Sequence, residues 1–254
     1  MSRQVAERSG FQLLVAKSTA QIRDAERVRS RVYSEEERLV GAHDQPEVSE
    51  LEPYEFSART KQLLVYSGAE PIGTLRLALA NGRGASSSRE FGFDLESSFV
   101  LGGFAQHGVV PAEVTRFCIL RRYRGTRVAS LLYAGLLAES ARLGVTHLVA
   151  EANMETDCAG DAALAYRLVL ERQWTDSRFS AVPRRVASPP AQPTRFVYTD
   201  EQRRQLHPAA LARMELPRTL TLFAHGMRAR YIGPPVYEPH FHVFALPLVA
   251  QLTD

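Results

Sequence analysis

The chain has 254 residues, 45% hydrophobic and 23% charged, which is the composition of a globular protein with one large domain or two small ones. A formal net charge of +3 is too low for a dedicated nucleic-acid-binding protein, and no run of about 18 apolar residues predicts a membrane-spanning helix. The polar N-terminus is unlike a signal peptide, and two cysteines are too few for a disulfide framework or a metal cluster, so we expect a cytoplasmic protein with reduced cysteines.

The first part of the chain predicts a strand, a helix and a hairpin. Ser18 and Thr19 can cap the helix, whose apolar residues recur at spacings of three and four from Ile22 to Val32, as on one helix face. Gly68 lies between two strand-like runs, which is typical of a hairpin. The predicted elements are a strand over residues 11–16, a helix that ends near Gly41, an acidic irregular segment over 42–60, and strands over 61–67 and 72–79.

The rest of the chain alternates strand and helix patterns. A loop at 81–88 precedes an apolar segment at 91–110 whose secondary structure the pattern does not define. The elements that follow are a strand over 113–120, a helix over 126–143, a strand over 144–153, a helix over 159–172, a proline-rich loop over 183–193, a short helix within 199–215, a helix over 219–227, and strands over 229–233 and 240–246. This order predicts a single α/β domain over residues 1–254 with a mixed sheet, in which residues 1–10 are flexible and 216–250 close the fold.

The most informative segment runs from Glu113 to Arg127. A buried strand carrying two charged residues, Glu113 and Arg116, leads into a turn where four arginines surround Gly125, and a helix follows at once. Such a turn points free N–H groups and the positive end of a helix dipole at one place, which suits a phosphate. The segment therefore predicts a phosphate anchor beside a chemical site. The four arginines are Arg121, Arg122, Arg124 and Arg127.

The strand–turn–helix unit resembles the GNAT acyltransferase superfamily through Arg122-Tyr-Arg-Gly125. The family's turn has the form Gln/Arg-x-x-Gly-x-Gly/Ala, and its backbone amides hold the pyrophosphate of coenzyme A or the phosphate of a pantetheine arm. Arg127 stands at the last small position, and its side chain narrows the turn. The resemblance implies a GNAT-like domain with a mixed, mostly antiparallel central sheet, flanking helices and splayed central strands.

A narrower resemblance is to acyl-homoserine-lactone (autoinducer) synthases and, more strongly, to N-acyl amino acid synthases and ornithine-lipid-type acyltransferases. The order of several motifs carries it over residues 10–250. Lactone synthases have a tryptophan shortly after the helix aromatic, where this chain has Leu39, and the single tryptophan here is Trp174. The motifs are Arg29-Ser-Arg-Val-Tyr33, Glu52-Pro-Tyr-Glu55, Gly73-Thr-Leu-Arg-Leu77, Glu113-Val-Thr-Arg-Phe117, Gly144-Val-Thr-His147, and the tail from Leu216 to Pro234.

The resemblance implies three groups of site residues. The catalytic group is Glu113, Arg116 and Tyr166. The acceptor-binding group is Arg29, Tyr33, Glu52, Glu55 and Arg76. The donor-binding group, for pantetheine and phosphate, is Phe117, Cys118, Ile119, Arg122, Arg124, Gly125, Thr126 and Arg127.

The acid–base residues have structural alternatives. Glu113 is our first choice for the carboxylate that takes the amine proton, but it also suits an ion pair with Arg76 or Arg29. Because Glu113 and Arg116 are three apart in a strand, we expect them to point to opposite faces. Arg76, in an otherwise apolar strand, calls for a carboxylate such as Glu55.

Other features are interpreted more simply. Tyr166 is a general acid for the leaving thiolate or a core residue. The segment 91–110 and the helix face of Leu131, Leu132 and Leu136 line a fatty-acyl tunnel or form plain core. His240 and His242 share a strand face but lack a third metal ligand, so we predict no metal site. Ser130 and Cys118 lack a nearby base, which argues against an acyl-enzyme.

Together these features predict an N-acyltransferase that moves a medium or long fatty acyl chain to the amine of an amino acid or related small amine. Acyl carrier protein or acyl-coenzyme A is the expected donor and partner, with no tightly bound cofactor. We expect no nucleic acid, and membrane contact only through the lipid product. The alternatives are a lactone synthase that uses S-adenosylmethionine and a non-catalytic sensor of acyl thioesters.

Overall fold

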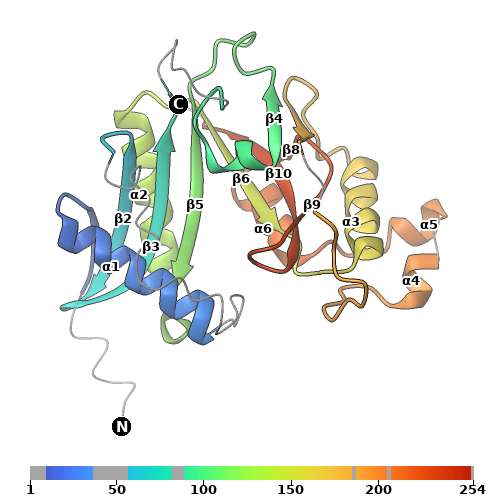
Figure 1. Ribbon diagram of the computed structural model, residues 1–254, viewed down its shortest axis with the longest axis horizontal. Coiled ribbons are helices and arrows are strands. Elements are labelled where there is room, and N and C mark those ends of the chain that lie inside the picture. The colour runs from blue at the N-terminus through green and yellow to red at the C-terminus, as the bar shows by residue number, and fades with distance from the viewer. Residues whose placement is uncertain (1–9, 37–56, 82–88, 185–186, 205–206, 253–254) are drawn as a thin grey trace. The chain divides into compact units, whose positions relative to one another are not determined.

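The computed structural model describes residues 10–36, 57–81, 89–184, 187–204 and 207–252, and it divides into two compact units (Figure 1). The first unit comprises Met1–Ala80 and Ala112–Val145, and the second comprises Asn81–Pro111 and Thr146–Asp254. The expectations of a single domain and of splayed central strands therefore stay predictions.

The first unit contains four antiparallel strands in the order β1-β2-β3-β5. Apolar residues of these strands form the core of the unit, as the strand patterns predict. The hairpin around Gly68, which has the positive φ of +60° that a tight turn needs, is confirmed between β2 and β3. The strands are β1 (Phe11–Val15), β2 (Thr60–Ser67), β3 (Glu70–Leu79) and β5 (Pro111–Ile119).

Two helices cover opposite faces of these strands (Figure 1). Helix α1 (Thr19–Ser30) starts at a capping box in which Ser18 and Gln21 exchange hydrogen bonds, and the π-helix η1 (Arg31–Glu36) continues it. Helix α2 (Val128–Arg142) lies against Gly73 of β3, where an added Cβ would come within 2.8 Å of Val128 Cγ1. Because side chains alternate along a strand, Arg76, three positions after Gly73, faces away from α2 and toward α1.

The second unit pairs β6 with β10 and β10 with both β8 and β9, all antiparallel. Strands β4 and β7 form a separate two-stranded sheet. Helix α6 packs on β6. The strands are β4 (Phe99–Gly102), β6 (His147–Asn153), β7 (Ser180–Pro183), β8 (Arg230–Tyr231), β9 (Val236–Glu238) and β10 (Val243–Gln251); the helices are α3 (Ala159–Glu171), α4 (Asp200–Arg204), α5 (Pro208–Leu211) and α6 (Arg218–Gly226), with 3₁₀ turns at η3 (Asp94–Ser97) and, in the first unit, η4 (Arg121–Tyr123).

The prediction of an α/β fold with a mostly antiparallel sheet flanked by helices is confirmed. The apolar segment 91–110 contributes buried aromatic rings to the second unit: Phe104 lies 4.6 Å from Phe179 and 5.7 Å from Phe91, centroid to centroid. Packed rings of this kind are core, which favours the plainer of the two interpretations of this segment. No helix in the described part of the chain has the length and apolar character needed to cross a membrane.

Candidate functional site

Charged side chains are buried on the face of the first unit's sheet that α1 covers. Arg76 of β3 is 1% exposed and Glu113 of β5 is 2% exposed, and Arg29 of α1 is also buried. The register aligns Arg76 with Thr115 and Ala78 with Glu113, so Arg76 and Glu113 occupy diagonal positions of one face. Such positions lie about 7–8 Å apart, within reach of long side chains. Since buried charges need partners, opposite charges placed in this way are suited to compensate each other.

Arg76 is further held by the neighbouring strand. Its Nε donates a hydrogen bond to the Thr115 Oγ1 at 2.9 Å. On the other side, Gln62 of β2 is the register partner of Arg76 and is itself buried. Polar side chains therefore occupy aligned positions on the neighbouring strands β2, β3 and β5, whose other inward side chains are mostly apolar. We call the set Arg29, Tyr33, Arg76, Glu113, Thr115 and Cys118 the polar cluster.

A β-bulge at Arg116 shapes this part of β5. Thr115 pairs with Arg76 and Cys118 with Thr74, so three steps along β5 match two along β3. Arg116 itself has a φ of +58°, in the left-handed region that few residues with side chains adopt. The expectation that Glu113 and Arg116 point to opposite faces assumed a regular strand, whereas the bulge interrupts the alternation of side chains at Arg116, so this expectation stays a prediction.

Tyr33 and Cys118 join helix and strand within the polar cluster. Burial raises the pKa of the Cys118 thiol to about 11, although the Tyr33 hydroxyl hydrogen-bonds the sulfur and Arg29, Arg116 and Arg124 favour the thiolate. Burial also raises the pKa of Tyr33, against the opposing charges of Arg116 and Arg29. Both groups are therefore neutral at neutral pH, and Cys118 is no activated nucleophile.

The turn after β5 has the predicted strand–turn–helix form. The 3₁₀ turn η4 follows the strand, Gly125 adopts a φ of +78°, and α2 begins at Val128. Arg127 occupies the N-cap position and makes no side-chain capping bond. Instead, its guanidinium lies 5.4 Å from the centre of the Phe11 ring. The Val128 N–H donates to the Thr126 Oγ1 at 3.4 Å, so within the described residues the turn itself supplies one acceptor for the N–H groups at the start of α2.

Two carboxylates of the chain contact this turn, which sequence reasoning missed. The Glu36 carboxylate accepts hydrogen bonds from the Arg121 N–H, at 3.0 and 2.8 Å, and from Arg124 at 3.2 Å. Glu70 is ion-paired with Arg122. These partners lie 85 and 52 residues away in sequence, so no local pattern could have shown them. Part of the predicted phosphate-binding charge is therefore compensated internally.

A family model described as "N-acyl amino acid synthase FeeM" matches residues 24–157, more than half of the chain. The chain belongs to this family. It is accordingly an acyltransferase, which confirms the enzyme class predicted from the sequence. The matched residues include the whole polar cluster and the turn of residues 121–127, which we call the basic turn. The FeeM family match therefore covers the buried charges and the arginine-rich turn together.

Solved structures resemble the chain at low identity. FeeM from uncultured soil microbes is 14% identical over 57% of this chain and 72% of its own, with a TM-score of 0.41. An acyl-CoA N-acyltransferase from Pseudomonas aeruginosa is 8% identical over 95% and 100%, with a TM-score of 0.49. No protein of curated function matches the chain. The assignment to the FeeM family rests on the family model.

The structure does not bring all predicted site residues together. Glu52 and Glu55 lie outside the described residues, so their acceptor-binding role stays a prediction. Tyr166 is on α3 of the second unit, where burial raises its pKa; its place beside a leaving thiolate also stays a prediction. His240 and His242 lie in the turn before β10 and not on a strand, which corrects their expected arrangement. In the described residues no group of three or more potential ligands could hold a metal.

The remaining donor-binding residues surround the bulge and the turn. Phe117 is 50% exposed, and Ile119 is buried at the end of β5. Thr126 is bound into the turn, where its Oγ1 donates to the Tyr123 carbonyl at 2.6 Å. Thr115, by contrast, was missed. A threonine in a strand is ordinary, and only its register opposite Arg76 reveals it.

Proposed function

We propose that this enzyme transfers a medium or long fatty acyl chain from a carrier thioester, either acyl carrier protein or acyl-coenzyme A, to the amine of an amino acid or related small amine. One observation carries the proposal. A strand with a buried glutamate and a bulge runs directly into a basic turn, inside the segment that matches the FeeM family. Such a segment combines an acid–base group with a phosphate anchor.

The proposed reaction is one direct acyl transfer. The amine nitrogen attacks the thioester carbonyl carbon, a C–N bond forms and the C–S bond breaks. Glu113 takes the proton that the amine loses, directly or through water, and the departing thiolate takes up a proton, which we assign to Tyr166. Backbone N–H groups near the bulge at Arg116 polarise the carbonyl oxygen as it becomes negative.

Direct attack is supported by the state of the one cysteine in the polar cluster. A pKa of about 11 keeps Cys118 protonated, whereas a covalent acyl-enzyme requires an activated thiolate. Cys118 therefore acts by filling space and by accepting the Tyr33 hydrogen bond.

The acceptor is expected to carry a carboxylate. Arg29 and Arg76 are buried guanidinium groups and Arg116 lies at the bulge, and a guanidinium binds a carboxylate through two parallel hydrogen bonds. We propose that one of them grips the acceptor carboxylate. An amino acid would then present its amine at a fixed distance from that anchor, toward Glu113.

The test is mass spectrometry of lipid extracts from a bacterial host that expresses the chain, the Glu113→Gln variant or the Glu139→Gln variant. Glu139 is the matched control, because its carboxylate is bound by Arg142 on α2, away from the polar cluster. We expect a new N-acylated amine with the wild type and the control, and its loss with Glu113→Gln. Equal product from Glu113→Gln would remove Glu113 as the base.

Two outcomes favour the alternatives. Release of methylthioadenosine with an acyl lactone would identify a lactone synthase. Tight binding of an acyl thioester by the purified protein, with no turnover of any amine supplied, would identify a sensor.

A further inference from the structure

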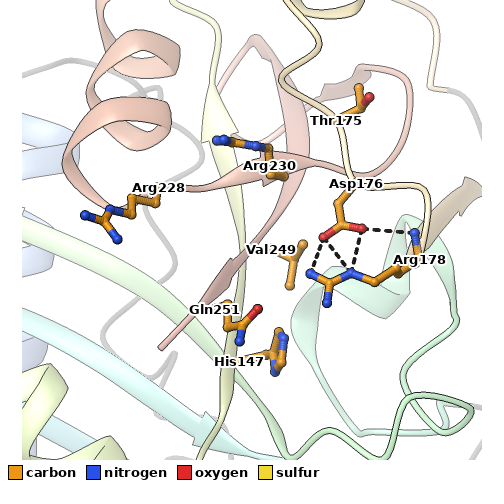
Figure 2. A pocket seen from close by; sticks show the side chains of 8 residues that line it. All are labelled: His147, Thr175, Asp176, Arg178, Arg228, Arg230, Val249 and Gln251. Atoms are coloured by element: carbon orange, nitrogen blue, oxygen red, sulfur yellow. Dashed lines mark hydrogen bonds and ion pairs between the residues drawn. The ribbon is translucent and has the colours of Figure 1, made fainter. Parts of the chain in front are cut away.

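The second unit contains a surface pocket of about 340 Å³ whose lining is rich in arginine. It lies among β6, β8, the end of β10 and the segment after α3, and Figure 2 shows its side chains. Most of its lining falls outside the residues matched by the FeeM family. The charged and titratable residues of the lining are His147, Asp176, Arg178, Arg228 and Arg230.

The pocket carries positive charge that its own acidic residue does not cancel. Asp176 is the single acid of the lining, and Arg178 holds it through Nε at 3.1 and 3.2 Å and through a terminal nitrogen at 2.7 Å. This pair is neutral as a unit (Figure 2). Arg228 and Arg230 supply the remaining charge; in Figure 2 their side chains extend away from His147, so both must turn inward to contact a shared ligand, and Arg230 donates to the Ala229 carbonyl at 3.0 Å. Arg228 holds a φ of +52°, the left-handed conformation that commonly ends a helix, and it follows the last turn of α6, where the Ala229 N–H donates to the Phe223 carbonyl at 3.1 Å.

His147 supplies a polar atom that lacks a partner. The ring is 6% exposed, and its Nε2 is buried without a hydrogen-bond partner in the described structure. Its Nδ1 lies 3.0 Å from the Thr146 Oγ1, which accepts from the Val110 N–H at 2.9 Å and donates to the Val110 carbonyl at 3.4 Å. Because the Thr146 hydroxyl donates its proton to the Val110 carbonyl, the ring Nδ1 is assigned as protonated and donates to the Thr146 Oγ1. The Nε2 atom is then the one available to a ligand.

We propose that this pocket binds a small oxyanion, a carboxylate or a phosphate, between Arg228, Arg230 and the Nε2 of His147. Guanidinium groups suit both kinds of oxyanion, since they offer paired donors in a plane. A buried polar atom without a partner is rare in native proteins, and an oxyanion would satisfy the Nε2 of His147 when the ring is protonated and Nε2 is a donor. The inference concerns binding and does not rest on the proposed acyl transfer.

Binding is expected to be linked to protonation of His147. Burial lowers the pKa of the ring, the Arg178 charge lowers it further, and Asp176 opposes both; Arg228 and Arg230 add positive charge around the pocket. An anion reverses this balance, because it favours the imidazolium, whose Nε2–H can then donate to it. By reciprocity, the anion binds more tightly as the pH falls through the raised pKa.

The first experiment uses the wild-type protein and needs no variant in the pocket. The His147 ring is followed by NMR across pH, with chloride, inorganic phosphate or succinate at one ionic strength, and the His147→Gln variant assigns its signal. We expect phosphate or succinate, but not chloride, to raise the pKa of His147. A response to phosphate alone identifies a phosphate site, and a response to succinate alone identifies a carboxylate site. No response to either overturns the proposal.

The second experiment tests the two arginines by calorimetric titration of the responding anion. The Arg228→Gln/Arg230→Gln double variant should bind at least about tenfold more weakly, because it removes the charge-assisted hydrogen bonds that the two guanidinium groups donate to the anion. Arg204→Gln, at an exposed arginine of α4, is the matched control and should bind as the wild type does. Unchanged affinity of the double variant would overturn the assignment. Should that variant fail to fold, the Arg228→Lys/Arg230→Lys variant keeps both charges but lacks the paired donors of the planar guanidinium. It should weaken binding to a smaller degree.

Discussion

At the scale of single residues, Arg76 has the most constrained surroundings of the polar cluster. It is 1% exposed, its Nε is bound to Thr115, and Glu113 occupies the diagonal position of the same face. A guanidinium can satisfy several such partners at once because its donors point in fixed directions, whereas an ammonium is a compact point charge. The geometry of Arg76, and not its charge alone, should therefore matter for the enzyme.

We predict that Arg76→Lys lowers turnover by about tenfold or more, since one charge-assisted hydrogen bond is worth about 1.5–3 kcal/mol. The measurement is the rate of N-acyl product formation by purified protein. Arg142→Lys is the control, because Arg142 is an exposed arginine whose carboxylate partner, Glu139, lies three residues away on the same helix. Full activity of Arg76→Lys would show that the charge suffices and that the fork has no role in acceptor binding.

The charged members of the polar cluster were predictable, and their contacts were not. Arg76 and Glu113 stand out because a charge within an apolar strand pattern demands an explanation. The link between Tyr33 and Cys118 joins residues 85 positions apart, and only the packing of η1 on β5 creates it. The bulge at Arg116 contains no glycine, so the sequence did not predict it, and the rule of alternating side chains does not apply across it.

At the scale of elements, two buried aspartates hold the long connection between β7 and α4. The Asp157 carboxylate accepts hydrogen bonds from the Thr194 N–H, at 3.0 Å to each oxygen, and from the Arg195 N–H at 2.8 Å. Asp161 accepts from the Val197 N–H at 2.6 Å and pairs with Arg203. Residues 187–199 contain no helix or strand, and two carboxylates, one just before α3 and one in its first turn, accept some of their backbone N–H groups instead.

We predict that Asp157→Asn lowers the free energy of unfolding by about 1.5–3 kcal/mol, because an amide oxygen is a weaker acceptor than a carboxylate that receives several N–H bonds. Chemical denaturation at neutral pH measures this. Glu171→Gln, at the other end of α3, is the control: its ion pair with Arg167 spans 4.0 Å on the surface and should contribute little. An equally stable Asp157→Asn protein would mean that the connection does not depend on this anchor.

The same anchor has a defined pH dependence. Burial opposes ionisation of Asp157, but the hydrogen bonds from Thr194 and Arg195 outweigh it and hold its pKa below the ordinary value. The stabilisation is therefore complete above the unfolded-state pKa of about 3.9 and is lost as the pH falls through the lower folded-state value. The difference in stability between wild type and Asp157→Asn should shrink in that acidic range.

Regular elements followed from the sequence wherever periodicity was long. The helix expected over 126–143 is α2 at Val128–Arg142, and the strand expected over 144–153 is β6 at His147–Asn153. The sequence did not predict the short strands β4, β7 and β9, because three or four residues are too few to show a periodic pattern of apolar side chains. The last strand extends past Pro247 to Gln251, although a proline inside a run ordinarily argues against a strand.

At the scale of the whole molecule, the family match and the two units divide the chain differently. The match over residues 24–157 contains most of the first unit and β6, whereas α3 through β10 lie beyond it. The first unit holds the buried charges and the basic turn, and the second holds the arginine-lined pocket. The features most closely tied to acyl transfer are thus inside the matched segment, and the proposed anion site lies mainly outside it.

The basic turn should make binding of the two possible acyl donors, acyl carrier protein and acyl-coenzyme A, respond differently to added salt. Arg122 and Arg124 are each paired with a carboxylate of the chain and 59% and 40% exposed, and Arg127 lies on Phe11, so three guanidinium groups face solvent beside the start of α2. An acyl carrier protein is acidic over a wide surface, and attraction between extended charged surfaces weakens as salt is added. Coenzyme A presents only its few phosphates, which bind at short range, where screening is weaker.

We predict that KM for an acyl carrier protein thioester rises steeply between about 0.05 and about 0.3 M salt, where the Debye length falls from above to below about 10 Å, while KM for the matching acyl-coenzyme A rises much less. Arg122→Gln/Arg127→Gln should raise the carrier-protein KM at low salt and flatten its salt dependence, because the charges that steer the encounter are gone. Arg204→Gln, remote from the turn in sequence, is the control. A carrier-protein KM that is insensitive to salt in the wild type would mean that these arginines do not dock the carrier, and that the turn serves the phosphates of coenzyme A.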